Sequence, residues 1–265
     1  MALITADRPG LSWRGTLLSN RAISVLSPVL LLALWEACAR FGVIDTRFFP
    51  APSVVVGHMV EMAREGSLWT NTAASLYRLG VGLVAGAVPA IVLGLAMGLY
   101  RPVYAAIDPL ISATYPIPKS SLLPLILLIF GLGESSKIVM VAIGVFYPIV
   151  INTAVGVRQI PPIFLDVGSN FRASSWNTFR TIALPGALPL IMTGIKLGAG
   201  MGLVLIAIAE MVGAKSGLGF MIWNAWELFD VATMYVGLFV IAIIGFVMNT
   251  ALDALERAVV PWKAR

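Results

Sequence analysis

Long uncharged apolar runs alternate with short polar connections along this chain. Three runs hold no charged residue at all, at residues 79–100, 138–157 and 231–252. Each comes close to the roughly 20 residues that cross the hydrocarbon of a bilayer at about 1.5 Å per residue. A fourth run, at residues 22–39, contains Glu36 near its end, where a side chain can reach the interface. The pattern predicts four membrane-spanning helices from these runs alone.

Two further runs are apolar but interrupted. Residues 109–133 include Lys119 and four prolines, and residues 188–212 include Lys196 and Glu210. With these two, we predict an all-α integral membrane protein with six transmembrane helices. The composition agrees, since 59% of the 265 residues are hydrophobic, 12% are charged and the mean hydropathy is +0.93. One soluble core could not bury that much apolar surface.

The chemistry-bearing residues are few. A lone cysteine, Cys38, leaves no disulfide framework or thiol metal site, and a lone histidine, His58, leaves no two-histidine metal motif. The net charge of +5 comes from basic residues that are scattered through the connections, which does not favour nucleic acid as a partner. We therefore expect neither a metal site nor a catalytic centre.

The basic residues instead indicate orientation. Six spans put both termini on one side, and the side with more lysine and arginine in its short loops is the cytoplasm. Placing the N-terminus there gives cytoplasmic segments 1–21 and 258–265 around a transmembrane domain, 22–257, with a cytoplasmic loop at 158–184. The basic residues of the inner segments are then Arg8, Arg14, Arg21, Arg101, Arg158, Arg172, Arg180, Arg257, Lys263 and Arg265. Those of the outer segments are Arg40, Arg47, Arg64, Arg78, Lys137 and Lys215.

The polar loop has a helical pattern of its own. Pro161-Pro162 is a plausible helix start, after which Phe164, Val167 and Phe171 fall on one face. Ser174 or Ser175 can cap a second short helix that Pro185 should end, because proline lacks a backbone donor. The second helix carries Trp176, Phe179 and Ile182 along one side. Two short helices with protruding aromatic side chains would form a knob; the alternative is a hairpin lying on lipid headgroups.

The loop also resembles the EAA loop of ABC importer permeases. In that motif a Glu-Ala-Ala triplet is followed by glycine and, further on, by Ile-x-Leu-Pro. This chain has Asp166-Val167-Gly168 for the triplet, Arg172 for the glycine, and Ile182, Leu184 and Pro185 at the end. Arginine in place of glycine puts the usual sharp bend between the two helices in question.

Other stretches extend the resemblance over residues 24–263. They are similar to the permease family that serves nitrate, taurine and alkanesulfonate importers. The stretches are Leu34-Trp35-Glu36, Phe49-Pro50-Ala51-Pro52-Ser53, Ile117-Pro118-Lys119, Leu123-Pro124, Phe130-Gly131-Leu132-Gly133-Glu134, Gly217-Leu218-Gly219 and Val260-Pro261-Trp262.

The resemblance implies a type I (MetI-like) importer permease in a bacterial inner membrane. Its implied partners are a second copy in a homodimer, two cytoplasmic ATPase subunits, an extracytoplasmic substrate-binding protein and membrane lipid. The chain itself has no Walker Gly-rich loop, so we expect a non-enzymatic transport subunit, with ATP and Mg²⁺ on the ATPase. We expect the loop to couple ATPase closure to alternating access. The expected coupling residues are Asp166, Val167, Gly168, Phe171, Arg172, Trp176, Phe179, Leu184 and Pro185.

Small residues repeat every four positions in two spans and predict close helix contacts. They are Gly82, Gly86, Gly94 and Gly98 in one span and Gly194, Gly198 and Gly202 in another. Packing within one subunit is the expected use, and a dimer seam is the alternative. Prolines such as Pro118 free backbone carbonyls in the third span, which makes that span a candidate lining of the substrate pathway.

Charged residues within spans are functional candidates by default. Lys119 and Lys196 could supply a positive field for an anionic substrate, or could reach the headgroups instead. Glu210 could form an ion pair at a gate with Lys215, or could be a hydrated interfacial carboxylate. Trp223, Trp226 and Phe229 could dock a binding protein or belong to the interfacial aromatic belt.

Three alternatives remain to be weighed: another substrate class, another class of transporter and an enzyme. The substrate could be a vitamin precursor or another aromatic heterocycle rather than a small anion. A secondary transporter driven by an ion gradient would be expected to show internal repeats, and none is obvious here. An intramembrane enzyme would need a catalytic constellation, and the sequence has no Gly-x-Ser-x-Gly and no histidine pair.

Overall fold

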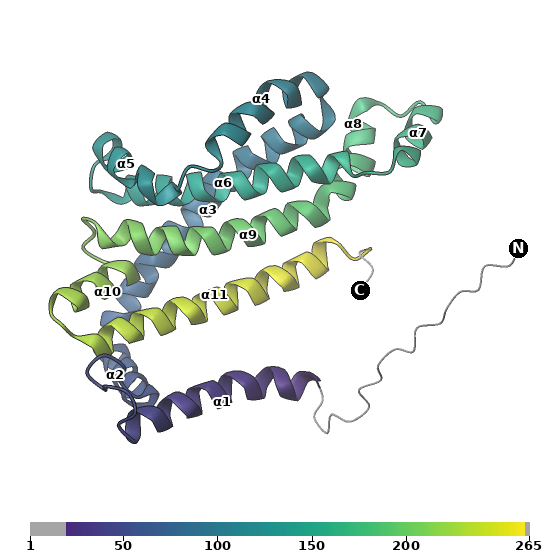
Figure 1. The fold of residues 1–265 in the computed structure, drawn as a ribbon. Coiled ribbons are helices and arrows are strands. Elements are labelled where there is room, and N and C mark those ends of the chain that lie inside the picture. The colour runs from purple at the N-terminus through teal and green to yellow at the C-terminus, as the bar shows by residue number, and fades with distance from the viewer. Residues whose placement is uncertain (1–19, 263–265) are drawn as a thin grey trace, which may run out of the picture. The chain divides into compact units, whose positions relative to one another are not determined.

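The computed structural model describes residues 20–262, and within this range every regular element is helical. Most of the predicted cytoplasmic segment 1–21 and the last three residues of the predicted tail 258–265 lie outside the described residues. The helices are α1 (Asn20–Arg40), α2 (Pro52–Glu65), α3 (Ser67–Leu99), α4 (Arg101–Thr114), the 3-10 helix η1 (Lys119–Leu122), α5 (Leu123–Phe130), α6 (Glu134–Arg158), α7 (Pro162–Asn170), α8 (Ser175–Thr178), the π-helical turn η2 (Phe179–Ala183), α9 (Leu184–Met211), α10 (Leu218–Glu227) and α11 (Val231–Val259) (Figure 1). The all-α expectation is confirmed.

The chain divides into two compact units, Met1–Val54 and Val55–Arg265. The first contains α1, which covers the predicted span 22–39. Near the end of this helix the Glu36 carboxylate accepts hydrogen bonds from Arg40 Nε at 2.6 Å and from the Ser53 amide at 3.0 Å. These bonds tie the connection that follows α1 back onto the helix.

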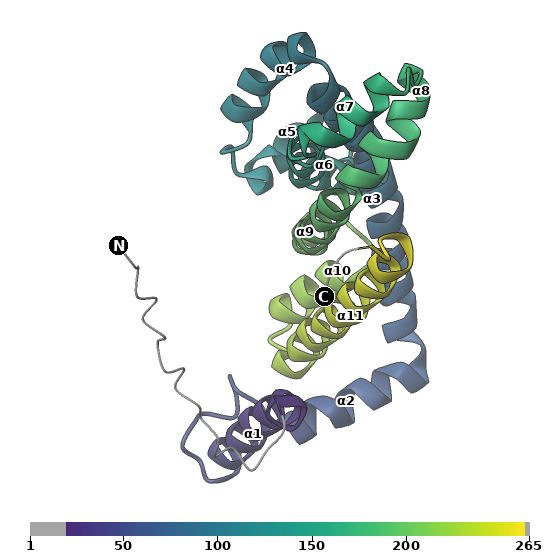
Figure 2. The same cartoon turned by 90° about the vertical axis from the view of Figure 1, so that its right-hand side faces the viewer.

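The second unit is organised around α6, which packs between α3 and α9 (Figure 2). Glycines make both contacts close. A Cβ added at Gly86 of α3 would lie 2.4 Å from the Ala142 carbonyl oxygen of α6, and one at Gly198 of α9 would lie 3.2 Å from that of Val145. Both small-residue stripes therefore pack within one subunit, as predicted.

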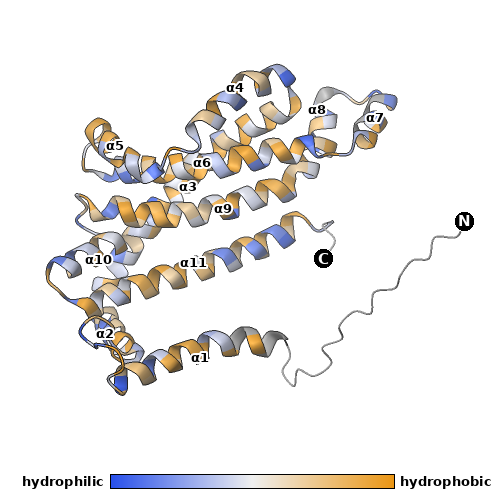
Figure 3. Ribbon diagram, in the orientation of Figure 1, coloured by the Kyte–Doolittle hydropathy of each residue, from blue (hydrophilic) through white to orange (hydrophobic). Residues whose placement is uncertain are grey.

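A separate apolar cluster joins α2, the start of α3, α10 and α11 at the end of the second unit away from the loop at 158–184. Its buried members are Val55, Met62, Leu68, Leu218, Met221, Val236 and Val240. Here α10 packs against both α9 and α11. The exposed sides of the long helices are mainly hydrophobic, which suits a surface that faces lipid (Figure 3).

Four helices are long and apolar enough to cross a membrane: α3, α6, the helix from Trp176 to Met211, and α11. A fifth candidate span is a bent pair, in which α4 and the segment Lys119–Phe130 meet at 89°. With α1, which at 1.5 Å per residue is about 31 Å long, the number of spans reaches the predicted six. The continuous third span expected at 109–133 is wrong in form. Its helix begins earlier, at Arg101, and breaks after Thr114, where Pro116 and Pro118 cannot donate backbone hydrogen bonds.

Candidate functional site

The first helix of the polar loop, α7, begins at Pro162 as predicted. Its apolar face packs on the second helix through Gly168, where an added Cβ would lie 3.1 Å from Ile182 Cδ1 and 3.6 Å from Thr178 Oγ1. Phe164 lies on the same face, whereas Phe171 at the helix end is 83% exposed. The small residue at position 168 thus lets α7 lie directly on its neighbour.

The sharp bend after α7 is present, although arginine replaces the family's glycine. Arg172 adopts the left-handed conformation, with a φ of 52°. The amide of Ala173 donates to the Gly168 carbonyl at 2.9 Å across the bend, which is the long bond of a Schellman helix end. The doubt raised by Arg172 is therefore resolved in favour of the bend, at the steric cost that a side chain has in this region.

The second helix of the loop begins at Ser174, whose hydroxyl accepts a hydrogen bond from the Asn177 amide at 3.3 Å. The rings of Trp176 and Phe179 stack with centroids 5.5 Å apart. The expectation that Pro185 ends this helix is wrong. The turn Phe179–Ala183 widens to π-helical geometry, with the Leu184 amide bonded to the Phe179 carbonyl, and the helix runs on to Met211. A widened turn accommodates the proline that a regular helix would not.

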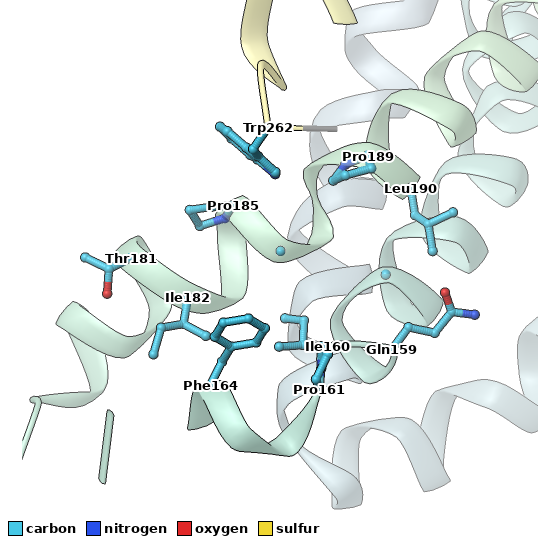
Figure 4. A pocket seen from close by; sticks show the side chains of 12 residues that line it. Gln159, Ile160, Pro161, Phe164, Thr181, Ile182, Pro185, Pro189, Leu190 and Trp262 are labelled. Atoms are coloured by element: carbon cyan, nitrogen blue, oxygen red, sulfur yellow. The ribbon is translucent and has the colours of Figure 1, made fainter. Parts of the chain in front are cut away.

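A cavity of about 410 Å³ lies behind the loop. Figure 4 shows Phe164 of α7 directed at Ile160 and Ile182, with Pro185 and Trp262 on the other side. Ile160 is 9% exposed and belongs to the apolar cluster that holds together the ends of α3, α6 and α9 nearest the loop. The loop is thus connected to three spans through side chains rather than through backbone alone.

At the opposite end of α9, Glu210 is completely buried and Arg78 of α3 is 3% exposed. Arg78 Nη1 donates to Glu210 Oε1 at 2.8 Å, and its Nε and Nη2 donate to Glu134 of α6 at 2.6 and 2.7 Å. Glu210 also accepts from the Ser75 hydroxyl and from the Gly219 amide at 3.0 Å. We call Ser75, Arg78, Glu134 and Glu210 the outer charge cluster, after the side of the membrane on which the predicted orientation would put it.

The outer charge cluster fixes the start of α10 as well. Arg78 donates to the Ser216 carbonyl at 2.6 Å, and the Ser75 hydroxyl accepts from the Leu218 amide at 2.8 Å. Neither alternative for Glu210 holds: Arg78 rather than Lys215 is the ion-pair partner of this carboxylate, and its complete burial excludes a hydrated interfacial position. Sequence reasoning had placed Arg78 in an outer loop. Its position directly before the uncharged run 79–100 was the available signal, because a charge at that place lies within the helix.

The two lysines of the predicted spans, Lys119 and Lys196, both have polar partners within the chain. Lys119 Nζ donates to the carbonyls of Thr114, Tyr115 and Ile117 at 2.9 to 3.0 Å and lies 4.0 Å from the centroid of the Tyr147 ring. It therefore satisfies carbonyls that the break after α4, where Pro118 precedes η1, would leave open.

Lys196 of α9 forms ion pairs with Asp253 and Glu256 of α11. Its side chain is 21% exposed, so it neither reaches freely to the headgroups nor presents an uncompensated charge. The two ion-pair groups of α9 thus lie apart along the helix, Lys196 toward the loop at 158–184 and Glu210 near the opposite end.

The aromatic side chains predicted between the last two spans lie in α10 and in the connection that follows it. Trp223 and Trp226 lie with ring centroids 4.8 Å apart, and Phe229 is 88% exposed. Asp230 caps α11 by accepting from the Thr233 amide at 3.1 Å. Partial burial raises the pKa of Asp230, but the hydrogen bonds from Thr233 outweigh it, so this pKa lies below its ordinary value. His58, for which no role was expected, bonds Thr233 Oγ1 at 2.8 Å.

Comparison with known proteins shows which family this chain resembles. Residues 90–265 match the family model for the binding-protein-dependent transport system inner membrane component. The chain is 34% identical over 257 residues to the taurine transport system permease of Escherichia coli, covering 95% of this chain and 94% of that protein. It is 35% identical to a nitrate import permease of Synechocystis over 71% and 68% of the two chains. It is 31% identical to a riboflavin transport system permease of Chloroflexus aurantiacus over 89% and 88%.

Proposed function

The chain belongs to the binding-protein-dependent transport system inner membrane components, and from this membership we propose that it imports a small organic or inorganic anion by alternating access driven through the loop at 158–184. It is a non-catalytic membrane permease subunit of an ABC importer. Two copies would form the pathway, two ATPase subunits would bind ATP and Mg²⁺ in the cytoplasm, and a binding protein would deliver substrate outside. Both termini would lie in the cytoplasm.

The observation that carries the coupling mechanism is the unbroken helix from Trp176 to Met211. Its first residue, Trp176, is 66% exposed, Phe171 at the end of α7 is 83% exposed, and α7 packs on this helix through Gly168. A subunit that grips these aromatic side chains would move the whole fifth span as one body, because packed helices move as rigid elements. Buried aromatic anchors dominate such contacts, so Arg172 and Arg180 would add little.

The break between α4 and α5 supports a role in the pathway. Tyr115 and Ile117 are 48% and 43% exposed in the single chain. Irregular backbone at membrane depth is tolerated only where protein covers it or where it lines a water-filled cavity. We therefore propose that the segment around Pro118 and Lys119 faces the pathway between two copies, with Lys196 and Glu210 holding the helices that open and close it.

The nature of the substrate is supported by relatives rather than by a charged site. Taurine and nitrate, named in two relatives, are both small molecules with an anionic group. The riboflavin relative favours the second candidate, an aromatic heterocycle. Competition of unlabelled taurine, nitrate and riboflavin against uptake into vesicles that contain the complete importer would separate the two classes.

The coupling proposal can be tested with Phe171→Asp and Trp176→Asp. Each should abolish substrate-stimulated ATP hydrolysis and reduce co-purification of the ATPase subunit, while the melting temperature stays unchanged. Phe41→Asp is the matched control, because this phenylalanine is also 83% exposed and lies outside the loop at 158–184. Full coupling in both loop variants would refute the mechanism, and uptake driven by an ion gradient without the ATPase would refute the importer itself.

A further inference from the structure

A cavity with a basic rim lies at the inner ends of α3, α4 and α6. It has a volume of about 330 Å³ and is lined by Met97, Gly98, Leu99, Arg101, Tyr104 and Arg158. Its walls come from the last turn of α3 and the first turn of α4, and Arg158 is the last residue of α6. None of these residues belongs to the coupling knob or to the outer charge cluster.

Close packing of two spans creates this cavity. A Cβ at Gly98 would lie 2.4 Å from Val157 Cβ, so glycine lets the end of α3 touch the end of α6. This contact brings Arg158 beside the turn into α4, where its guanidinium carbon lies 4.1 Å from the centroid of the Tyr104 ring. The ring holds the guanidinium by a cation–π contact and leaves its N–H donors for another group.

The two arginines have no charge partner in the part of the chain that the structure describes. Among the described residues 20–262, neither Arg101 nor Arg158 has a carboxylate within 4.0 Å, whereas Arg78 and Lys196 have two each. The tendency of basic residues to lie on the cytoplasmic side explains why arginines occur at this level. It does not explain why two of them converge on one cavity with a tyrosine between them.

We propose that this cavity binds the phosphodiester group of an anionic membrane lipid in the cytoplasmic leaflet. Guanidinium groups form paired hydrogen bonds with phosphate oxygens, and basic pockets between transmembrane helices are suited to such headgroups. The apolar side chain of Leu99, which is 38% exposed, favours a lipid over a free anion, because it offers a surface to the start of an acyl chain. The assignment rests on the proposed cytoplasmic orientation but not on the coupling mechanism.

Binding would reach the coupling loop directly. Gln159, the residue after Arg158, lines the cavity behind the loop together with Ile160 and Pro161. A lipid phosphate that fixes Arg158 would therefore also fix the point where the loop leaves α6. We infer that anionic lipid stabilises the permease and adjusts how firmly the loop is held.

The test uses the purified permease in phosphatidylcholine nanodiscs to which phosphatidylglycerol is added in steps. The melting temperature should rise with phosphatidylglycerol, and native mass spectrometry should detect retained lipid. Arg101→Gln and Arg158→Gln should each weaken this binding about fivefold, as expected for one basic residue near an anionic headgroup. Tyr104→Phe, which keeps the ring beneath Arg158, should bind as the unaltered protein does.

Arg257→Gln is the matched control, because Arg257 is an exposed arginine near the inner end of α11, away from the cavity. Equal weakening by this variant would mean a diffuse attraction to the membrane and would overturn the proposal. Inorganic phosphate added to nanodiscs of pure phosphatidylcholine should have no effect at millimolar concentration; a matching rise in melting temperature would assign the cavity to a soluble anion. Melting and lipid retention need no ATPase, so failure here is distinct from failure of the proposed transport function.

Discussion

Replacing Glu210 with alanine tests the outer charge cluster directly. The change removes the acceptor for Arg78, Ser75 and the Gly219 amide together. Breaking a buried ion pair by removing one partner costs about 3 to 5 kcal/mol, because the other charge stays buried. Glu134 remains beside Arg78 and its side chain is 55% exposed, so we expect the lower end, about 3 kcal/mol. For a chain of this size that corresponds to a fall in melting temperature of about 6 to 12 °C.

The melting temperature can be followed by tryptophan fluorescence of the permease in nanodiscs of one lipid composition. Glu227→Ala provides the control, because Glu227 is exposed and accepts a single hydrogen bond from Trp223. Its effect should stay within about 0.5 kcal/mol, as for most surface substitutions. A melting temperature for Glu210→Ala as high as that of Glu227→Ala would refute the assigned role of the cluster.

A double variant separates the loss of a charge pair from the loss of packing. Arg78→Met combined with Glu210→Leu removes both charges and keeps apolar volume, which is often neutral for buried pairs. The double variant should therefore melt higher than Glu210→Ala alone. If the stability losses of Arg78→Met alone and Glu210→Leu alone simply add up in the double variant, the two side chains do not stabilise each other. The ion pair would then not be the cause of the loss.

Three further predictions concern helix contacts and the loop. Gly86→Ala should destabilise the permease by about 1 to 3 kcal/mol through overpacking, whereas Gly80→Ala, with nothing within 4 Å of an added Cβ, should be neutral or stabilising in the same melting assay. Lys196→Gln leaves the two acidic partners on α11 facing each other and should lower stability by about 1 kcal/mol, while the apparent KM for an anionic substrate stays unchanged; a large rise in KM would restore the anion-field hypothesis. Arg172→Gly should keep the coupling intact and raise stability by up to about 1 kcal/mol because it relieves the left-handed conformation, and a loss of coupling would show that the guanidinium contacts the ATPase.

The spans were predictable because hydropathy is a local property. The uncharged runs at 79–100, 138–157 and 231–252 fall within or just past the ends of α3, α6 and α11. The starts of α7 and α8 were also predictable, since Pro162 and Ser174 act on the backbone next to them. Each of these signals needs only neighbouring residues to be read.

The predictions from sequence were wrong where interactions between distant residues, or competing local effects, determine the structure. The burial of Arg78 depends on Glu210, which is 132 positions away, so no window around either residue shows the pair. Pro185 is a helix breaker by itself, but the widened turn before it removes the conflict. Pro116 and Pro118 lie within one predicted span, but the helices on either side of them, α4 and the segment Lys119–Phe130, meet at 89°.

The straight part of the helix from Trp176 to Met211 is α9 (Leu184–Met211), because α8 lies at an angle to it (Figures 1 and 2). Its 28 residues make it about 42 Å long at 1.5 Å per residue, which exceeds the roughly 30 Å of bilayer hydrocarbon. A tilt of about 10° around its midpoint would carry its two ends about 4 Å in opposite directions, by the geometry of a straight helix. A displacement of the end near Leu184 would then move Glu210 at the other end without any change in the helix itself, and the ion pair with Arg78 would set the force needed to start the movement.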